Sequence, residues 1–429
     1  MSNFQITPIR YIKGEIELPP DKSIFHRALI LSSLAQGKSK IKKIQRGEDC
    51  LSTLNNLKLM GVKIEEKKES LLVYGEGLRS LKEPPDILNC GNSATTMRLL
   101  AGVIAGQGFY SVLSGDEYLK KRPMKRITEP LRKMGAKVFG REDGQFPPLT
   151  LAGGRLRGIH YSSPIPSAQV KSCILLAGLF AEGDTSVTEP LQSRDHTERM
   201  LRYLGGDLEI DNLKVTVKEG SVLEGKKIFV PGDISGAAFF IAGAVILGGS
   251  ELKIINVGLN PTRRGFLDIL IRMGAEIEII SQKTKCEEEV GNLLIKGGSE
   301  LEGIVIEKEI IPQLIDEIPV LAVVACFAQG ETVIRGAKEL RFKETDRIKA
   351  IVEGLRKMGA NIEEKEDGMV IRGGKKLKGG ECQSYGDHRI AMALTIAALG
   401  AKKKSKIIDV ECINTSFPEF REILKNISV

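Results

Sequence analysis

The stretch EGLRKMGANIEE, residues 353–364, is one copy of a phrase that recurs along the chain. The phrase reads as the end of a helix, a glycine and the start of a strand. The glycine stands where a helix stops in the left-handed backbone conformation that glycine adopts without strain. The other copies are NNLKLMGVKIEE (55–66), EPLRKMGAKVFG (129–140), RMLRYLGGDLEI (199–210) and DILIRMGAEIEI (268–279), and SFPEFREILKNI (416–427) resembles a shortened sixth.

A second phrase, a helix that is apolar on nearly every side followed by a strand, recurs six times. Such helices are expected to be buried. The two phrases alternate at a period of about 70 residues, which predicts an α/β protein of six repeats. Two lobes of three repeats are the simplest packing, because one core rarely grows past about 250–300 residues. The copies are ALILSSLAQGKSKI (28–41), LLAGVIAGQGFYSV (99–112), LLAGLFAEGDTSV (175–187), FIAGAVILGGSELKI (240–254), LAVVACFAQGETVI (321–334) and ALTIAALGAKKKSKI (393–407).

Composition indicates an ordinary globular protein, with 42% hydrophobic and 28% charged residues among 429. The longest nearly apolar run, 237–249, is too short to span a bilayer, and the segment 1–18 reads as an alternating strand without an apolar signal core. An odd number of scattered cysteines, seven in all, argues against a disulfide framework and favours the reducing cytoplasm. The four histidines show no metal-ligand spacing.

The net charge of +8 is compatible with nucleic acid or with small anionic substrates. Few aromatic residues stand beside the basic ones, so stacking on bases has little support.

The most charged helix start is RFKETDR, residues 341–347. A helix that begins near Glu344 would place Lys343 and Arg347 on one face, with Glu344 three residues before Arg347. A helix N-terminus can hold an anion, and a nearby glutamate can exchange protons with it. The alternative is a solvated, charged first turn without function.

Most of the other helices also begin beside polar or charged residues. Caps explain the Ser, Asp, Asn and Pro residues at these positions. They do not explain arginines, because a cation is unfavourable at the positive end of a helix dipole without a compensating anion. The sequence therefore predicts that the helix starts face a common anion-binding cleft. The residues concerned are Asp21, Lys22, Ser23, Arg27, Asn92, Ser93, Arg122, Ser167, Gln169, Lys171, Arg194, Asp195, Asp233, Arg263, Arg264, Asp316, Glu317, Asp387, His388 and Arg389.

Read together, these motifs resemble those of the 5-enolpyruvylshikimate-3-phosphate synthases, the 3-phosphoshikimate 1-carboxyvinyltransferases of the enolpyruvyl transferase family. The resemblance covers essentially the whole chain, and the ordered conjunction of motifs is far more specific than any one of them. They are DKSIFHRA (21–28), LNCGNSATTMRLLAG (88–102), KRPM (121–124), PSAQVKS (166–172), SRDHTERM (193–200), DEIPVLAV (316–323), RFKETDRI (341–348) and GDHRIAMA (386–393).

The resemblance implies two lobes of three βαβαββ units, the inside-out α/β barrel of this family, with the active site in the cleft between the lobes. The chain should cross between lobes near Pro20 and Pro231. Residues 1–20 and 231–429 would form lobe I, and residues 21–230 lobe II.

The implied reaction transfers the enolpyruvyl group of phosphoenolpyruvate to the 5-hydroxyl of shikimate 3-phosphate, with release of phosphate through a tetrahedral intermediate. It is a step of the shikimate pathway, toward chorismate and the aromatic amino acids. The resemblance implies a cytoplasmic monomer that needs no metal or organic cofactor and binds neither nucleic acid nor membranes.

The resemblance also assigns site residues. Asp316 resembles the catalytic base, and Glu344 and Lys22 resemble the proton donors. Shikimate 3-phosphate would be bound by Lys22, Ser23, Arg27, Ser167, Ala168, Gln169, Arg194, Asp316 and Lys343. Phosphoenolpyruvate would be bound by Lys22, Asn92, Ala94, Arg122, Gln169, Arg347 and Arg389.

Two positions depart from the family pattern. Ala94 stands where many members have a glycine, which predicts weakened inhibition by glyphosate, the inhibitor that binds in place of phosphoenolpyruvate. Thr415 and Ser416 precede Phe417, where some members carry a lysine, so a lysine contact from that loop is not expected.

Two alternatives remain from the sequence. The sister enzyme that transfers enolpyruvyl to UDP-N-acetylglucosamine uses the same repeats, but its loop places a cysteine shortly before an Arg-Pro, and the loop 115–123 has none. A non-catalytic polyanion-binding module would also account for the positive charge.

Overall fold

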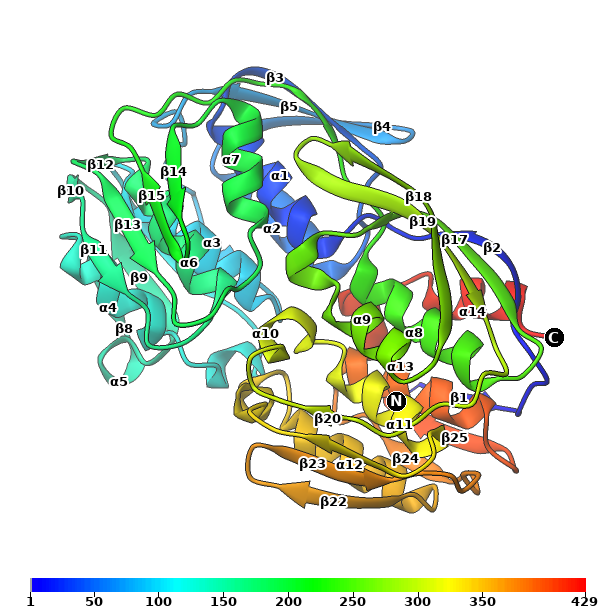
Figure 1. Ribbon diagram of the computed structural model, residues 1–429. Helices are drawn as coiled ribbons and strands as arrows, with labels where there is room; N and C mark the ends of the chain where they lie inside the picture. The colour runs from blue at the N-terminus through cyan, green and yellow to red at the C-terminus, as the bar shows by residue number, and fades with distance from the viewer. Residues whose placement is uncertain (1) are drawn as a thin grey trace. The chain divides into compact units, whose positions relative to one another are not determined.

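The computed structural model describes residues 2–429, and its contacts divide the chain into two compact units (Figure 1). Unit 1 takes in the chain up to Asp21, Pro231–Thr284 and Glu289–Val429. Unit 2 consists of Lys22–Val230 and Lys285–Glu288. Each unit contains three of the six repeats.

The expected lobe boundaries need two corrections. Asp21 belongs to unit 1, because its backbone N–H donates to Pro231 O (2.7 Å) and its carboxylate lies 3.2 Å from Arg263. The hairpin tip 285–288 belongs to unit 2, where Glu288 lies 2.7 Å from His196 Nδ1.

The three repeats of unit 2 share one order of elements, strand, buried helix, strand, outer helix and two strands. The first repeat is β16 (Lys227–Phe229), α1 (Lys22–Leu34), β3 (Gln36–Lys42), α2 (Glu48–Leu59), β4 (Lys63–Lys67) and β5 (Ser70–Glu76). The second is β6 (Leu88–Asn89), α3 (Ala94–Ala105), β7 (Tyr110–Ser114), α4 (Lys125–Lys133), β8 (Lys137–Gly140) and β9 (Phe146–Ala152). The third is β11 (His160–Ser162), α6 (Ala168–Gly178), β13 (Thr185–Thr188), α7 (His196–Leu204), β14 (Leu208–Asp211) and β15 (Lys214–Val217).

Unit 1 repeats this order. Its first repeat is β2 (Lys13–Glu17), α8 (Ile234–Ile246), β17 (Glu251–Gly258), α9 (Gly265–Arg272), β18 (Glu276–Lys285) and β19 (Glu288–Lys296). Its second is β20 (Val305–Ile306), α11 (Ile318–Phe327), β21 (Glu331–Ile334), α12 (Arg347–Lys357), β22 (Asn361–Lys365) and β23 (Gly368–Arg372). The last has β24 (Glu381–Gln383), α13 (His388–Leu399), β25 (Ser405–Ile408), α14 (Phe420–Ile427) and β1 (Asn3–Ile6).

Minor elements lie between the main elements of these repeats. They are α5 (Arg141–Gly144), α10 (Ile311–Leu314), the strand pair β10 (Leu156–Arg157) and β12 (Ala181–Glu182), and the 3₁₀ helices η1 (Leu119–Lys121), η2 (Pro261–Arg263), η3 (Lys338–Phe342) and η4 (Glu411–Thr415).

The sheets confirm the sixfold repeat. In the second repeat of unit 2, β6 runs parallel to β7, β7 antiparallel to β9, and β9 antiparallel to β8. The same strand order recurs in five four-stranded sheets, and the sixth sheet, β1-β25-β24, has three strands. The glycines of the recurring phrase, Gly61, Gly135, Gly205, Gly274 and Gly359, all have positive φ angles of 85° to 99°, as predicted.

The crossing of the chain explains why one repeat in each unit takes its first strand from elsewhere. Strand β2 precedes α1 in sequence but pairs in parallel with β17 of unit 1. Strand β16 precedes α8 but pairs in parallel with β3 of unit 2. The two crossing segments bond to each other, since Asp233 N–H donates to Pro19 O (3.0 Å).

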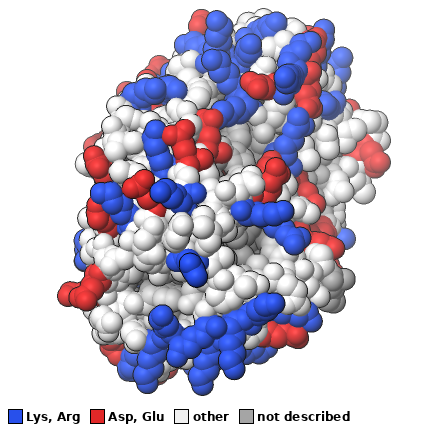
Figure 2. Space-filling model, turned by 90° about the vertical axis from the view of Figure 1, so that its right-hand side faces the viewer, with Lys and Arg blue, Asp and Glu red and all other residues white. Residues whose placement is uncertain are grey.

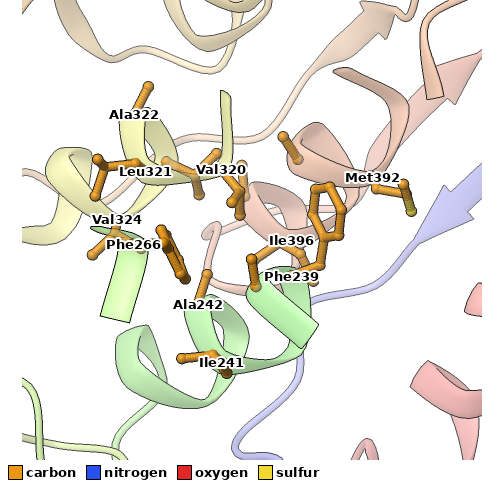
Figure 3. Close-up of a cluster of buried hydrophobic side chains, with 14 of the residues drawn as sticks. Phe239, Ile241, Ala242, Phe266, Val320, Leu321, Ala322, Val324, Met392 and Ile396 are labelled. Atoms are coloured by element: carbon orange, nitrogen blue, oxygen red, sulfur yellow. The ribbon is translucent and has the colours of Figure 1, made fainter. Parts of the chain in front are cut away.

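The six apolar helices are buried, as predicted. In unit 1, side chains of α8, α11 and α13 pack together, including Phe239, Val320 and Ile396 (Figure 3). Phe417 and Phe420 also pack against this core. Their ring centroids lie 5.5–6.0 Å from those of Phe239, Phe240 and each other. The core of unit 2 is built in the same way on α1, α3 and α6.

The prediction of one strand over residues 1–18 is wrong. The structure has two strands, β1 and β2, that join different sheets. Pro8 lies between them, and proline lacks the N–H that a continuous ladder requires. None of the helices within residues 2–429 is long and apolar enough to cross a membrane.

Candidate active site

Arg347, the first residue of α12, is the centre of a carboxylate cluster in unit 1. Its Nε donates to Asp387 (2.7 Å), Nη1 to Asp316 (3.2 Å) and Nη2 to Glu344 (2.5 Å). The Arg347 side chain is 1% exposed. Burial alone would lower the pKa of Arg347, but the carboxylates of Asp387, Glu344 and Asp316 raise it, so the guanidinium stays charged.

Asp316 lies just before α11 and is surrounded by cations. One carboxylate oxygen is 3.2 Å from Arg347 Nη1 and 3.7 Å from Lys343 Nζ. The other is 3.6 Å from Arg389 Nη2, and Arg389 Nη1 donates to the backbone carbonyl of Asp316. The structure thus brings together Asp316, Lys343, Glu344, Arg347 and Arg389, the five unit 1 residues that the resemblance assigns.

The predicted start of the helix near Glu344 is wrong. Residues 338–342 form η3, and α12 begins at Arg347 after the N-cap Asp346, whose side chain accepts from Lys349 N–H (3.1 Å). Lys343 therefore precedes the helix and does not share a face with Arg347. Both still reach Asp316, and the burial of Arg347 excludes a merely solvated turn at that residue.

In unit 2, Lys22 is the first residue of α1 and pairs with Asp49 (2.9 Å), which lies in the first turn of α2. Asn92 donates its side-chain amide to Asp116 (2.8 Å). Glu48 precedes Asp49 in α2. Burial raises the pKa of Glu48, and the charges of Asp49 and Asp116 raise it further. Lys22 therefore lies beside Asp49, a carboxylate that the sequence analysis did not assign to the site.

Gln169 and Ala94 lie at the starts of α6 and α3. Arg98 Nη1 donates to the side-chain oxygen of Gln169 (2.5 Å), and Gln169 in turn donates to Thr95 (2.8 Å). Arg98 Nη2 donates to Pro123 O (2.8 Å), next to Arg122. Arg98 thus ties together three segments assigned to phosphoenolpyruvate. Ala94 is buried, at 2% exposure.

Arg27 is buried where three helices start. Its Nε donates to Thr197 of α7 (2.6 Å), Nη2 to Ser172 of α6 (2.7 Å) and Nη1 to the backbone oxygen of Ser23 (2.8 Å). Arg27 and Ser23, both assigned to shikimate 3-phosphate, are therefore adjacent on α1.

Ser167 caps α6, where its hydroxyl accepts from Val170 N–H (3.5 Å), and Ala168 follows as the first helical residue. Arg194 lies two residues before α7. Both segments contact Glu189, which accepts from the N–H of Ser167 (3.0 Å) and from the hydroxyl of Ser193 (2.9 Å).

Sequence reasoning missed several supporting residues. Asp49, Arg98, Asp116, Glu189 and Glu198 make their contacts with residues distant in the chain or on other elements, so no local spacing marked them. The acidic pair Glu48 and Asp49 at a helix start was the one visible signal. Among residues 2–429 no group of three or more His, Cys, Asp or Glu residues is placed to hold a metal ion.

A sequence model of the family described as EPSP synthase (3-phosphoshikimate 1-carboxyvinyltransferase) matches residues 6–424. The chain belongs to the EPSP synthase family. Among curated relatives, the 3-phosphoshikimate 1-carboxyvinyltransferase of Geobacter metallireducens is 50% identical and covers 100% of both chains. That of Desulforamulus reducens is 51% identical and covers 99% of both chains.

Solved structures agree with this membership. The EPSP synthase of Acinetobacter baumannii matches with a TM-score of 0.89 and 43% identity, over 100% of this chain and 98% of that one. The enolpyruvyl transferase NikO from Streptomyces tendae matches with a TM-score of 0.79 at 15% identity, over 99% of this chain and 96% of that one, which shows a shared fold. The predicted enolpyruvyl transferase fold is confirmed.

As an EPSP synthase, the chain transfers the enolpyruvyl group of phosphoenolpyruvate to shikimate 3-phosphate in the shikimate pathway. The family membership sets aside both alternatives, the UDP-N-acetylglucosamine enzyme and the non-catalytic module.

Proposed function

We propose that the Asp316 cluster of unit 1 and the helix starts of unit 2 act together on the two substrates, in a cleft between the lobes. The observation that carries this proposal is the arrangement around Asp316, where a carboxylate suited to accept a proton lies among three cations suited to hold anions. Each set is described within its own unit, and their joint action is the proposal.

Phosphoenolpyruvate is held, in this proposal, by Arg347 and Arg389 from one unit and by Lys22, Arg122 and Gln169 from the other, beside Asn92 and Ala94. Arg347 has five N–H groups, and its three hydrogen bonds use one on each nitrogen. One N–H on Nη1 and one on Nη2 therefore remain for a bidentate contact with a carboxylate or phosphate. The three carboxylates fix the plane of the guanidinium.

Shikimate 3-phosphate is held by Ser23 and Arg27 at its carboxylate and by Ser167, Ala168, Gln169 and Arg194 at its phosphate. The start of α6 supports the phosphate assignment, because a capped helix N-terminus directs N–H groups at an anion. Lys22, Lys343 and Asp316 complete this set.

The 5-hydroxyl oxygen of shikimate 3-phosphate bonds to the central carbon of phosphoenolpyruvate, and Asp316 accepts the proton that this hydroxyl loses. Glu344 and Lys22 supply the proton that the methylene carbon takes up. Loss of that methyl proton and departure of phosphate then give the product. Glu344 is bound to Arg347, which the phosphoenolpyruvate set also contains, so the proton donor is held beside that substrate.

We also propose that the protein is a cytoplasmic monomer that uses no metal or organic cofactor and does not bind nucleic acid or membranes. Phosphate is the leaving group, and arginine and lysine side chains supply the charge stabilisation.

The positive charge of the chain does not require a polyanion partner. Lys and Arg side chains gather along the lower edge and across the upper part of the face in Figure 2, with acidic side chains among them. The exposed lysines of 402–404 follow the C-terminal end of α13, whereas Arg389 lies in its first turn. These lysines are therefore remote from the proposed site.

The test is release of phosphate from phosphoenolpyruvate by the purified protein with each acceptor. We expect turnover with shikimate 3-phosphate and none with UDP-N-acetylglucosamine. Turnover with the UDP-sugar alone would overturn the assignment of the acceptor residues. Salt-dependent binding of a nucleic acid would contradict the proposal that the protein binds no nucleic acid.

A further inference from the structure

A buried lysine in unit 2 joins two carboxylates behind the proposed phosphate pocket. Lys171 Nζ lies 2.7 Å from Glu189 Oε2 and 2.7 Å from Glu198 Oε1. None of the three side chains is more than 3% exposed. Lys171 lies in the first turn of α6, Glu198 in the first turn of α7, and Glu189 in the loop between β13 and α7. None of the three is assigned to a substrate.

Glu189 holds two backbone segments at once. Its Oε1 accepts the backbone N–H of Ser167, the N-cap of α6 (3.0 Å). Its Oε2 accepts the hydroxyl (2.9 Å) and the backbone N–H (3.4 Å) of Ser193, which immediately precedes Arg194. One carboxylate thus fixes both segments that carry the proposed phosphate ligands.

In this group one cation faces two carboxylates. Burial alone would lower the pKa of Lys171, but Glu198 and Glu189 raise it, so the ammonium stays charged. Burial raises the pKa of Glu198, and Glu198 Oε2 has no hydrogen-bond partner among the described residues. This shift favours the neutral form of Glu198 and so limits the negative charge beside Lys171. An unbalanced carboxylate behind the pocket would repel a phosphate.

Stability alone is a weak reason for such a group, because desolvation offsets most of the attraction in a buried ion pair. Its geometry, in contrast, bears directly on the pocket. We propose that Glu189, held in place by Lys171, is a positioning residue for the phosphate of shikimate 3-phosphate, aligning the start of α6 with the segment of Arg194. This inference rests on the proposed function of Ser167 and Arg194.

The test compares Glu189→Gln with Glu198→Gln. Both changes remove a carboxylate that lies 2.7 Å from Lys171, but Glu189 alone bonds to Ser167 and Ser193. A glutamine at position 189 has one acceptor oxygen, so it keeps either the contact with Ser167 or those with Ser193 and Lys171 and loses the other. Calorimetric titration with shikimate 3-phosphate, and with shikimate as a probe without phosphate, measures each dissociation constant.

For Glu189→Gln we expect the dissociation constant and KM for shikimate 3-phosphate to rise about tenfold, the effect of losing a hydrogen bond to a charged group. The dissociation constant for shikimate and the KM for phosphoenolpyruvate should stay within about twofold of wild type, and Glu198→Gln should change binding by less than about threefold. Equal effects of the two variants, parallel weakening for shikimate, or unchanged binding by Glu189→Gln would overturn the inference.

Two further variants keep the outcomes separate. Arg194→Ala tests the pocket itself. If Arg194→Ala binds shikimate 3-phosphate like wild type, the proposed phosphate pocket is wrong. If Arg194→Ala weakens binding and Glu189→Gln does not, the pocket stands and only the role of Glu189 is refuted. If Glu189→Gln does not fold, Ser193→Ala removes one bond to Glu189, and it should weaken shikimate 3-phosphate binding about threefold and leave shikimate unaffected. No change in Ser193→Ala would then refute the role of Glu189.

Discussion

Arg347 and Asp387 form a buried ion pair in which Nε lies 2.7 Å from Oδ2, with the side chains 1% and 0% exposed. The other carboxylate oxygen of Asp387 accepts the backbone N–H groups of Arg389 (2.8 Å) and Ile390 (3.4 Å). One carboxylate therefore caps α13 and also orients the first residue of α12.

Asp387→Asn should lower the free energy of unfolding by about 3–5 kcal/mol, because it removes the most buried of the three carboxylates that compensate the buried Arg347 charge. Asparagine is as good a cap as aspartate, so loss of the cap contributes little. The KM for phosphoenolpyruvate should rise in the same variant, since Arg347 loses a bond that fixes its plane. Urea unfolding and steady-state kinetics measure the two effects.

Asp346→Asn is the matched control. Asp346 also caps a helix with one oxygen and binds an arginine with the other, Arg341 Nη1 at 2.7 Å, but its side chain is 33% exposed. Exposed pairs contribute less than about 1 kcal/mol. Equal destabilisation by the two substitutions would show that burial of the Arg347 pair is not what matters.

Stability should depend on pH through Glu198. Burial raises the pKa of Glu198 above its ordinary value of 4.5, so folding favours the protonated form. This contribution is fully present below the unfolded pKa and is lost as pH rises through the folded pKa. Glu198→Gln cannot ionise, so its free energy of unfolding relative to wild type should increase as the pH rises above the ordinary pKa of 4.5 and through the raised folded pKa of Glu198. Urea unfolding at several pH values measures this, and a constant or falling difference would show that Glu198 is ionised in the folded protein.

The repeats, the buried helices and several helix-start residues of the candidate site could be predicted from the sequence. Gly359 and its equivalents mark helix ends by a local conformational requirement, and apolar runs such as 321–328 report burial directly. The same local signals place Arg347 and Arg389 at helix starts.

Features set by contacts distant in sequence could not be predicted. Glu189 contacts Lys171 and Ser193 from a loop, and Lys22 meets Asp49 across 27 residues. The start of α12 is set by its N-cap Asp346, which the sequence does not distinguish from the charged residues beside it. The N-terminal segment forms two strands because Pro8 lacks the N–H that a continuous ladder requires. Asp21 joins unit 1 through its bonds to Pro231 and Arg263.

Ala94→Gly should make the protein more sensitive to glyphosate. Ala94 is the first residue of α3, and its methyl group occupies buried space where a glycine would leave room. One methyl group in a pocket corresponds to about 1–3 kcal/mol, so the inhibition constant should fall about tenfold or more, with near-normal use of phosphoenolpyruvate.

The control is Ala101→Gly, a buried position within the same helix, which should destabilise α3 without changing inhibition. Equal inhibition constants for wild type and Ala94→Gly would refute the steric argument.

Ligand binding should make the protein more compact. The residues assigned to each substrate come from both units, and hinge closure brings such groups around a ligand and excludes water. Small-angle scattering with shikimate 3-phosphate and an inert phosphoenolpyruvate mimic should show a smaller radius of gyration than the free protein. Identical profiles would count against closure.

The most direct test of the proposed chemistry is the rate of phosphate release by Asp316→Ala at saturating phosphoenolpyruvate and shikimate 3-phosphate. A general base contributes about 10²–10⁴-fold, so we predict a fall in kcat of that size. Asp346→Asn, which alters a carboxylate paired with Arg341 outside the Asp316 cluster, should retain normal turnover. Near-normal kcat in a folded Asp316→Ala variant would show that Asp316 is not the catalytic base.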